Sequence, residues 1–207
     1  MRLAVAILPL VTACSLYFGS GGDGHTGGSG GGGAMVDGTK RVFVTSATYQ
    51  GGALGGLAGA DAKCSDRAAA AGLDGTFAAW LSDAGTSAAE RLTHSTGSYV
   101  LVDGTTIAAS WTDLLRGALA HAIDRDEDGQ VRVAVPTCML VNGAWTATTF
   151  DGAYYVAPYG EQYSCGGWTD LHGNGVLGDV SHSDATWTYS GCADLCTNVA
   201  ALYCIEQ

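Results

Sequence analysis

The chain has 207 residues, which suits one folded domain with extra segments and is short for a multidomain enzyme. Hydrophobic residues make up 47% and charged residues only 14%, so a buried core is expected and a charge-dominated disordered chain is excluded. Nine Lys and Arg residues stand against 20 Asp and Glu, a net charge of -11. Because so few cations are present to neutralise phosphate or sulfate, we expect neither nucleic acid nor heparin-like polyanions as partners.

The N-terminal segment predicts an export signal. Arg2 precedes an apolar run from Leu3 to Val11, and small residues lead directly into Cys14. The pattern resembles the lipobox of bacterial lipoproteins, in which the cysteine receives acyl chains such as palmitate and becomes the mature N-terminus. We therefore expect residues 1–13 to be a lipoprotein signal peptide and Cys14 to be lipidated. An ordinary secretory signal with an incidental cysteine is the alternative.

Such an anchor places the mature protein on a membrane without a spanning helix. Ser15 rather than aspartate follows the lipidated position, which favours the outer membrane or cell surface of a bacterial envelope. Residues 14–39 are rich in Gly and Ser and predict a flexible tether. Residues 40–207 then form the folded domain.

The first half of this domain alternates strand and helix signals. Residues 41–45 are β-branched and alternating and predict an opening strand, and 77–81 predict a second, buried strand. Between them, 57–71 predict an amphipathic helix that ends at Gly72. Residues 87–90 have the spacing of a capping box and predict a short helical turn.

The second half contains turns, short elements and long loops. Asp103-Gly104 predicts a hairpin over 99–108, and Asn142-Gly143 predicts another over 139–146. A short helix capped by Ser110 is expected over 111–116. Residues 160–192 lack periodicity and predict long loops, and 199–205 predict a closing strand. Strands and helices mixed without a βαβ rhythm indicate the α+β class.

Several segments of the domain carry a resemblance to a known family. They are Cys64 in its Ala-Asp-Ala-Lys-Cys context, Gly75 to Ser82, Tyr99 to Gly104, Trp111, Cys165-Gly166-Gly167-Trp168, Cys196 and the closing Cys204-Ile205-Glu206. In this order they resemble endostatin and a bacterial domain of unknown function shared with leptospiral endostatin-like surface lipoproteins. The resemblance covers nearly all of 41–207. It implies a C-type-lectin-like (endostatin-like) fold that is disulfide-stapled, loop-rich and closed by adjacent chain ends.

The resemblance also implies a cysteine pairing. Without Cys14, six of the seven cysteines remain, an even number that suits an oxidising compartment. The family pattern pairs Cys64 with Cys204 and Cys165 with Cys196, and it leaves Cys138 with Cys192. The zinc-ligand alternative for Cys192 and Cys196 is weak, because exported cysteines are usually oxidised.

Two properties of endostatin are not carried over to this chain. Its heparin affinity is attributed to an arginine-rich face, whereas this chain has few arginines among excess acid. Its zinc site uses histidines at the extreme N-terminus, where this chain has its glycine-rich tether. The sugar-binding motifs of calcium-dependent lectins are absent as well. The resemblance therefore implies a fold without implying these ligands.

One acidic segment resembles the first half of a calcium loop. Carboxylates at alternating positions followed by glycine predict a calcium site with Asp124, Asp126 and Asp128 as ligands and the carbonyl of Gln130 as a fourth. The twelfth position is Val135 rather than a bidentate Glu, so the second half of the motif fails. A solvated acidic turn without metal is the alternative, and no other cofactor is expected.

The late loops gather aromatic and polar side chains that suit sugars or peptide segments. The candidate ligand-binding residues are Tyr159, Tyr163, Asp170, Asn174 and Asp179. Trp168 and Trp187 lie in the same segment and are expected in the core.

We therefore predict a cell-surface lipoprotein that presents a non-catalytic, endostatin-like module for a protein or glycan ligand. No catalytic residue is assigned, because the nucleophile-elbow and phosphate-loop motifs are absent from the chain. Sequence order does not exclude a Ser/His/Asp site assembled in space. A surface-tethered hydrolase of envelope polymers, with its site near His172 or His182, is thus one alternative, and a structural envelope component is another.

Overall fold

The computed structural model describes residues 35–36, 38–132 and 143–207. The chain divides into two compact units, Met1–Gly30 and Gly31–Gln207, and all elements below belong to the second. The predicted signal peptide, Cys14, Cys138 and most of the tether lie outside the described residues. Within the described ranges, no helix is both long enough and apolar enough to cross a bilayer.

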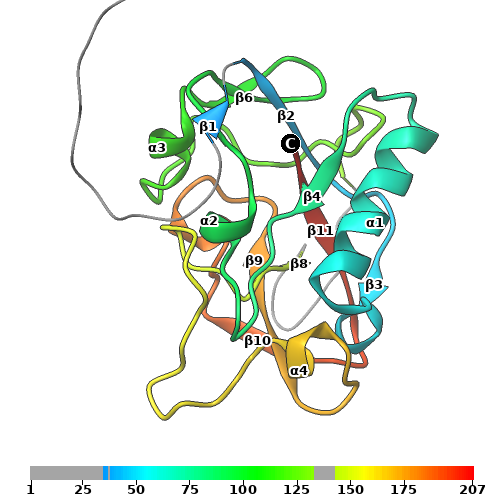
Figure 1. Ribbon diagram of the computed structural model, residues 1–207, viewed down its shortest axis with the longest axis vertical. Coiled ribbons are helices and arrows are strands. Elements are labelled where there is room, and N and C mark those ends of the chain that lie inside the picture. The colour runs from blue at the N-terminus through cyan, green and yellow to red at the C-terminus, as the bar shows by residue number, and fades with distance from the viewer. Residues whose placement is uncertain (1–34, 37, 133–142) are drawn as a thin grey trace, which may run out of the picture. The chain divides into compact units, whose positions relative to one another are not determined.

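The described residues form an α+β domain, which confirms the predicted class (Figure 1). Their main sheet has nine strands. Seven follow one path, in the order β10 (Cys192–Leu195), β9 (Asn174–Asp179), β8 (Gly143–Trp145), β11 (Val199–Glu206), β2 (Lys40–Val44), β6 (Tyr99–Leu101) and β7 (Thr106–Ala108). The short strands β3 (Tyr49–Gln50) and β4 (Phe77–Ala79) also pair with β11.

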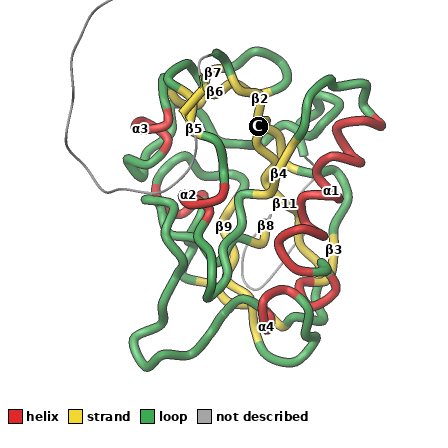
Figure 2. The backbone as a smooth tube through the Cα atoms, viewed as in Figure 1, coloured by secondary structure: helices red, strands yellow, loops and turns green. Residues whose placement is uncertain are grey.

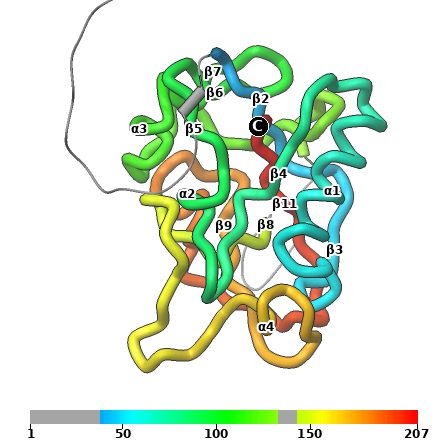
Figure 3. Tube along the Cα trace, viewed as in Figure 1, coloured from blue at the N-terminus to red at the C-terminus, as the bar shows by residue number. Residues whose placement is uncertain are grey.

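Strand β11 is the centre of this sheet. Its first half pairs with β3 and β8, and its second half pairs with β2 and β4. Figure 3 shows β11, in red, beside β2, in blue, so the first long strand and the last strand are neighbours. At this junction the carboxylate of Glu206 accepts hydrogen bonds from the backbone and guanidinium of Arg41. The two ends of the folded domain are therefore held side by side by strand pairing and by this ion pair.

Two hydrophobic clusters lie on the two faces of β11. Ala201, Tyr203 and Ile205 belong to one cluster, and Ala200, Leu202 and Cys204 belong to the other. This alternation follows from the two-residue period of a strand, and it explains why the closing segment is apolar at nearly every position. The five tryptophans divide between the same clusters and are all buried, which confirms the core assignment of Trp168 and Trp187.

Helix α1 (Gly56–Ala70) packs against β4 and β11 and is the longest helix of the described chain (Figure 2). It buries Ala60, Cys64 and Ala68, one per turn, and it ends at Ala70, two residues before Gly72, whose φ of 70° suits glycine. The remaining helices are short: η1 (Gly51–Ala53), α2 (Ala88–Arg91), α3 (Trp111–Leu114), α4 (Cys165–Trp168) and η2 (Ala185–Trp187).

The predicted elements of the first half are confirmed to within two residues at their ends. The capping box forms as expected, with Ser87 and Glu90 each accepting the other's backbone N–H. Three differences stand out. Residues 174–179, expected in a long loop, form strand β9. Gly143, expected in a turn, is the first residue of β8. Met35–Val36, expected in the tether, form a short strand β1 that pairs with β5 (His94–Ser95), so ordered backbone extends into the tether region.

Disulfides tie these elements together. Cys64 of α1 is bonded to Cys204 of β11 over a separation of 140 residues, and Cys165 is bonded to Cys196 over 31. These are the pairs that the family resemblance implies. Cys192 is disulfide-bonded as well, and its expected partner, Cys138, lies outside the described residues. The first bond clamps the one long helix onto the central strand.

A buried carboxylate anchors the acidic segment to the domain. Glu127 is 2% exposed and accepts hydrogen bonds from the backbone N–H of Ser46 at 2.8 Å and from the Ser46 hydroxyl. It also forms an ion pair with Arg67 of α1. The segment is therefore held against the end of β2 and against α1 by one side chain.

We expect Glu127→Gln to lower the free energy of unfolding by roughly 2–3 kcal/mol, because charge-assisted hydrogen bonds are lost at a buried position. Asp128→Asn, on an exposed neighbour in the same loop, serves as the control and should change stability by less than about 0.5 kcal/mol. Urea denaturation at neutral pH measures both.

The same residue predicts acid sensitivity. Burial alone would raise the pKa of the Glu127 carboxyl, but hydrogen bonds from Ser46 and Arg67 outweigh it and lower the pKa. A lowered native pKa stabilises the fold above the unfolded-state pKa, about 4.3 for Glu, and this contribution disappears as the pH falls through the native value. Wild type should therefore lose more stability on acidification than Glu127→Gln does, and parallel pH profiles would contradict this assignment.

Candidate functional site

The described residues do not gather the predicted calcium ligands. Nowhere in the described ranges do three or more His, Cys, Asp or Glu side chains form a group able to hold a metal ion. Asp126 instead accepts the backbone N–H groups of Asp128 and Gln130, and the carbonyl of Gln130 accepts the N–H of Asp126. Asp124 lies 2.9 Å from the guanidinium of Arg125, an ion pair without hydrogen-bond geometry.

The calcium site therefore stays a prediction, since in the described conformation its proposed ligands make contacts within the loop instead of forming one group. The loop closes on itself because its carboxylate and carbonyl oxygens are used by its own N–H groups and by Arg125. The solvated-turn alternative is also incomplete, since Glu127 of the same segment is buried. The alternating aspartates mark a turn, and the buried carboxylate of Glu127 attaches that turn to Ser46 and Arg67.

The predicted ligand-binding residues do not form one site. Tyr159 is 90% exposed, whereas Asp179 is buried and accepts hydrogen bonds from Ser181. Asn174 and Asp179 occupy the two ends of β9, roughly 17 Å apart at the rise of a strand. Asp170 accepts from the backbone and ring of His172, which lowers the pKa of its carboxyl. Of the five residues, only Tyr163 lines a pocket described below.

Within the described residues, neither histidine proposed for a hydrolase belongs to a Ser/His/Asp triad. His172 is 95% exposed and pairs only with Asp170 two residues earlier. His182 lies 3.3 Å from Asp179 and 3.4 Å from the hydroxyl of Ser181, and both contacts use Nδ1. A nucleophile and an orienting acid need opposite nitrogens of the imidazole, so this turn does not reproduce a Ser/His/Asp triad.

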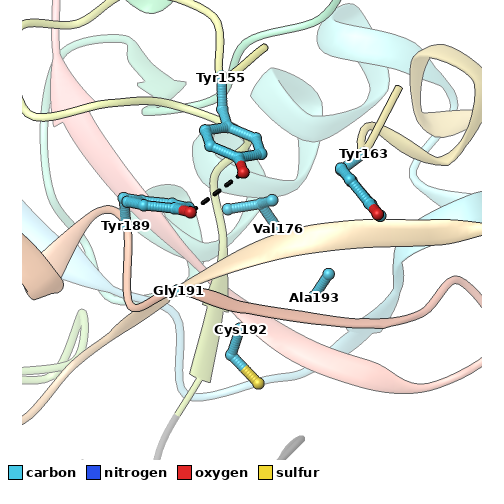
Figure 4. Close-up of a pocket in the computed structure, with 7 residues that line it drawn as sticks. All are labelled: Tyr155, Tyr163, Val176, Tyr189, Gly191, Cys192 and Ala193. Atoms are coloured by element: carbon cyan, nitrogen blue, oxygen red, sulfur yellow. Dashed lines mark hydrogen bonds between the residues drawn. The ribbon is translucent and has the colours of Figure 1, made fainter. Parts of the chain in front are cut away.

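A small pocket opens beside the β9–β10 hairpin, and tyrosines form its walls. Figure 4 shows Tyr155, Tyr163 and Tyr189 on one side of the two strands. Val176 and Ala193, which are register partners in β9 and β10, line it with Gly191. The sulfur of Cys192, the next residue along β10, points away from the tyrosines (Figure 4). We call this the tyrosine pocket.

Two of the rings are fixed against each other. Tyr155 and Tyr189 are stacked with centroids 4.5 Å apart, and the Tyr189 hydroxyl donates to the Tyr155 hydroxyl at 3.1 Å. The Tyr163 ring is tilted toward Tyr155 with centroids 6.3 Å apart. The hydrogen bond to Tyr155, together with burial, raises the pKa of Tyr189 to about 12. The Tyr189 phenol is therefore neutral at physiological pH.

Backbone bonds hold each tyrosine against the sheet. The N–H of Tyr155 donates to Ala147, and the carbonyl of Tyr163 accepts from Val176. Ser190, which follows Tyr189, donates to the carbonyl of Leu177 through both its N–H and its hydroxyl. Two of the wall segments are thus fixed to β9, and Tyr155 is fixed to Ala147, two residues beyond the end of β8, which preorganises the rings.

The residues after Tyr163 form an unusual turn that supports it. Cys165 and Trp168 have φ values of 49° and 68°, and the two glycines between them are also left-handed. Left-handed backbone costs roughly 1–2 kcal/mol at a residue with a side chain. The turn is held by the disulfide of Cys165 and by the bond from the Trp168 indole to the carbonyl of Ser82.

Two other pockets among the described residues are larger, but most of the charged side chains that line them already form ion pairs. One of about 430 Å³ lies beside Asp103 and Glu127, whose carboxylates already pair with arginines. Another of about 360 Å³ is lined mainly by small side chains with the paired Asp113 and Arg116. The tyrosine pocket is about 130 Å³, below the roughly 300 Å³ of a typical small-molecule site, so it suits one side chain or one ring.

Two features of the sequence point to this pocket. Tyrosines recur at 155, 163 and 189 in a segment without helical or strand periodicity. Moreover, none of the nine Lys and Arg residues lies after Arg132, while seven Asp and Glu residues do. The strand residues that line the pocket, Val176 and Ala193, had no comparable signal because β9 contains two glycines.

Those glycines are required by close packing. A Cβ on Gly175 would lie 2.9 Å from the Trp145 ring, and one on Gly178 would lie 2.0 Å from the carbonyl oxygen of Trp187. Glycine lets β9 approach both tryptophans. As a result, the sequence of β9 resembles that of a loop.

The chain matches no protein-family model and no curated protein.

The hydrogen bond between the two phenols gives a direct test of the pocket geometry. We expect Tyr155→Phe to lower the pKa of Tyr189 from about 12 toward the ordinary value near 10, because the protonated form loses its acceptor. Carbon NMR of the tyrosine rings during a pH titration measures this shift. Tyr159→Phe, on the same loop but outside the pocket, should leave the Tyr189 titration unchanged; a drop in both variants would refute the pairing.

Proposed function

We propose that this protein is a non-catalytic binding module whose ligand docks at the tyrosine pocket. The observation that carries the proposal is the preorganised set of Tyr155, Tyr163 and Tyr189 beside the β9–β10 hairpin. Tyrosine rings offer large apolar faces with polar tips at a low entropy cost, which is why they recur at binding hot spots. The ligand class is a protein or a glycan.

We further propose that the domain has a C-type-lectin-like fold of the endostatin type. Three features support this assignment. The first long strand and the last strand are paired, a mixed sheet carries one long helix, and disulfides join distant segments. Long irregular segments between β8 and β10 supply the pocket walls, as loops on a rigid scaffold do in many binding proteins.

The lipoprotein signal and tether suggest where the module works. Acylation of Cys14 would hold the protein at a bacterial envelope, on the outer membrane or cell surface. A tether of roughly 25 Gly- and Ser-rich residues has a root-mean-square reach on the order of 25–30 Å. Such a domain would meet ligands outside the cell, which suits binding better than a role in the cytoplasm.

The distribution of positive charge supports excluding heparin-like ligands and nucleic acid. Five arginines form ion pairs with carboxylates, namely Arg41, Arg67, Arg91, Arg116 and Arg125. Arg132 is 7% exposed and donates to the carbonyl of Thr45. Cations engaged in this way do not provide the free basic face that a polyanion requires.

An array of glycans and extracellular-matrix proteins, probed with the full-length protein, tests the proposal. We expect at least one ligand whose binding falls at least tenfold in Tyr155→Ala/Tyr163→Ala, because both ring faces are lost. Binding should persist in chelator, since the acidic loop uses its own oxygens.

His172→Ala/His182→Ala is the matched control for the hydrolase alternative and should bind like wild type. Turnover of an envelope polymer that disappears in this histidine variant would contradict a non-catalytic module. If the Tyr155→Ala/Tyr163→Ala variant bound the ligand as tightly as wild type, the ligand site would not be the tyrosine pocket.

A further inference from the structure

We propose that the tyrosine pocket receives an arginine or lysine side chain from a basic polypeptide segment. This inference rests on the proposed binding function and specifies its partner as cationic protein rather than glycan. Three independent observations carry it: the chemistry and size of the pocket, the charge of the loops around it, and the exposed apolar residues beside it.

The pocket matches one cationic side chain. A volume of about 130 Å³ accommodates a single group rather than an extended chain. Aromatic rings attract ammonium and guanidinium groups through the negative charge on their faces. The Tyr155 oxygen accepts one hydrogen bond from Tyr189 and keeps a second lone pair, and a guanidinium is a donor without acceptors. A carboxylate ligand would find no positive side chain among the pocket residues.

The surrounding sequence is purely acidic or neutral. Residues 133–207 contain no Lys or Arg. Exposed carboxylates flank the pocket tyrosines along the chain: Asp151 precedes Tyr155, Glu161 precedes Tyr163, and Asp184 precedes Tyr189. The arginines elsewhere in the described chain are paired or buried, as shown above. The chain segments that supply the pocket walls therefore carry carboxylates and no lysine or arginine, which favours a basic partner over an acidic one.

Exposed apolar side chains extend the surface beyond one pocket. Val156 is 68% exposed and Tyr159 is 90% exposed, and both belong to the loop that joins two of the pocket tyrosines. Together with the pocket they provide an anchor position and flanking contact area, the usual arrangement at a peptide-binding surface. A free cation would make no use of these residues, whereas a polypeptide segment would.

The test uses full-length protein and three probes: a fluorescein-labelled Gly-Arg repeat peptide of nine residues, a matched Gly-Glu peptide, and chitohexaose. Tyr163→Leu removes one ring, Tyr163→Phe restores it, and Phe150→Leu changes an exposed ring outside the pocket and its flanking residues. These variants have equal net charge, so unspecific attraction of the peptide to an acidic protein is the same in all of them.

We expect the arginine peptide to bind and the glutamate peptide not to bind. Tyr163→Leu should raise the dissociation constant at least about fivefold, the effect of losing a cation–π contact, while Tyr163→Phe and Phe150→Leu should change it less than twofold. In wild type, amide NMR shifts at Gly191 and Ala193 should move on addition of the arginine peptide. This second measurement decides the matter even if a variant fails to fold.

Equal affinities in all variants, unmoved Gly191 and Ala193 amides, or no peptide binding would overturn the inference. Chitohexaose binding that is lost in Tyr163→Leu would overturn it too, but would uphold the pocket as a binding site. The partner class and the proposed function therefore fail separately.

Discussion

The central strand β11 is the constraint on which the rest of this structure depends. It is paired along both edges and buried on both faces, so each of its side chains from Ala200 to Ile205 contributes to one core or the other. The bond from Cys204 to Cys64 adds a covalent link to α1 and closes a loop of 140 residues. In the chain-entropy picture a loop of this length stabilises by roughly 5 kcal/mol. Because the last strand is the hub, the fold is complete only when the C-terminal residues have joined it.

The candidate site follows from this arrangement. Strands β8, β9 and β10 extend the sheet outward from β11, and the tyrosine pocket lies on the outermost pair. Its walls come from loops, but each tyrosine is bonded through its own or a neighbouring backbone group to Ala147, Val176 or Leu177. The left-handed backbone at Cys165 is conformationally unfavourable, and β9 needs glycines where it packs on two tryptophans. The surrounding fold stabilises both features. The result is a set of rings fixed before any ligand arrives.

Local signals predicted the first half of the fold well and the late half poorly. The capping box of Ser87, the glycine after α1 and the alternating opening strand depend on neighbours in sequence, so their patterns were sufficient. Strand β9 was missed because Gly175 and Gly178 are set by distant tryptophans. The disulfide pairs came from family resemblance rather than from spacing, since six cysteines permit 15 pairings.

The functional residues show the same division. The acidic run of Asp124 to Gln130 predicted a calcium loop, whereas Glu127 turned inward to meet Ser46 and Arg67, partners 60 residues or more away. Tyr163 was identified from composition, but its companions on β9 and β10 depend on strand pairing that no local pattern revealed. The net negative charge of the chain was evident from its composition. Its concentration after Arg132 became meaningful only once those loops were seen to surround a pocket.

Hydrogen–deuterium exchange of the full-length protein, with and without the Gly-Arg peptide, tests the central claim most directly. The account predicts that amides of β11 exchange slowest of all, and that the peptide adds protection within 155–163 and 189–193 without slowing exchange elsewhere. Early exchange of β11 would contradict its role as the structural hub. Peptide-induced protection confined to another surface would show that the rigid tyrosine pocket is not the binding site.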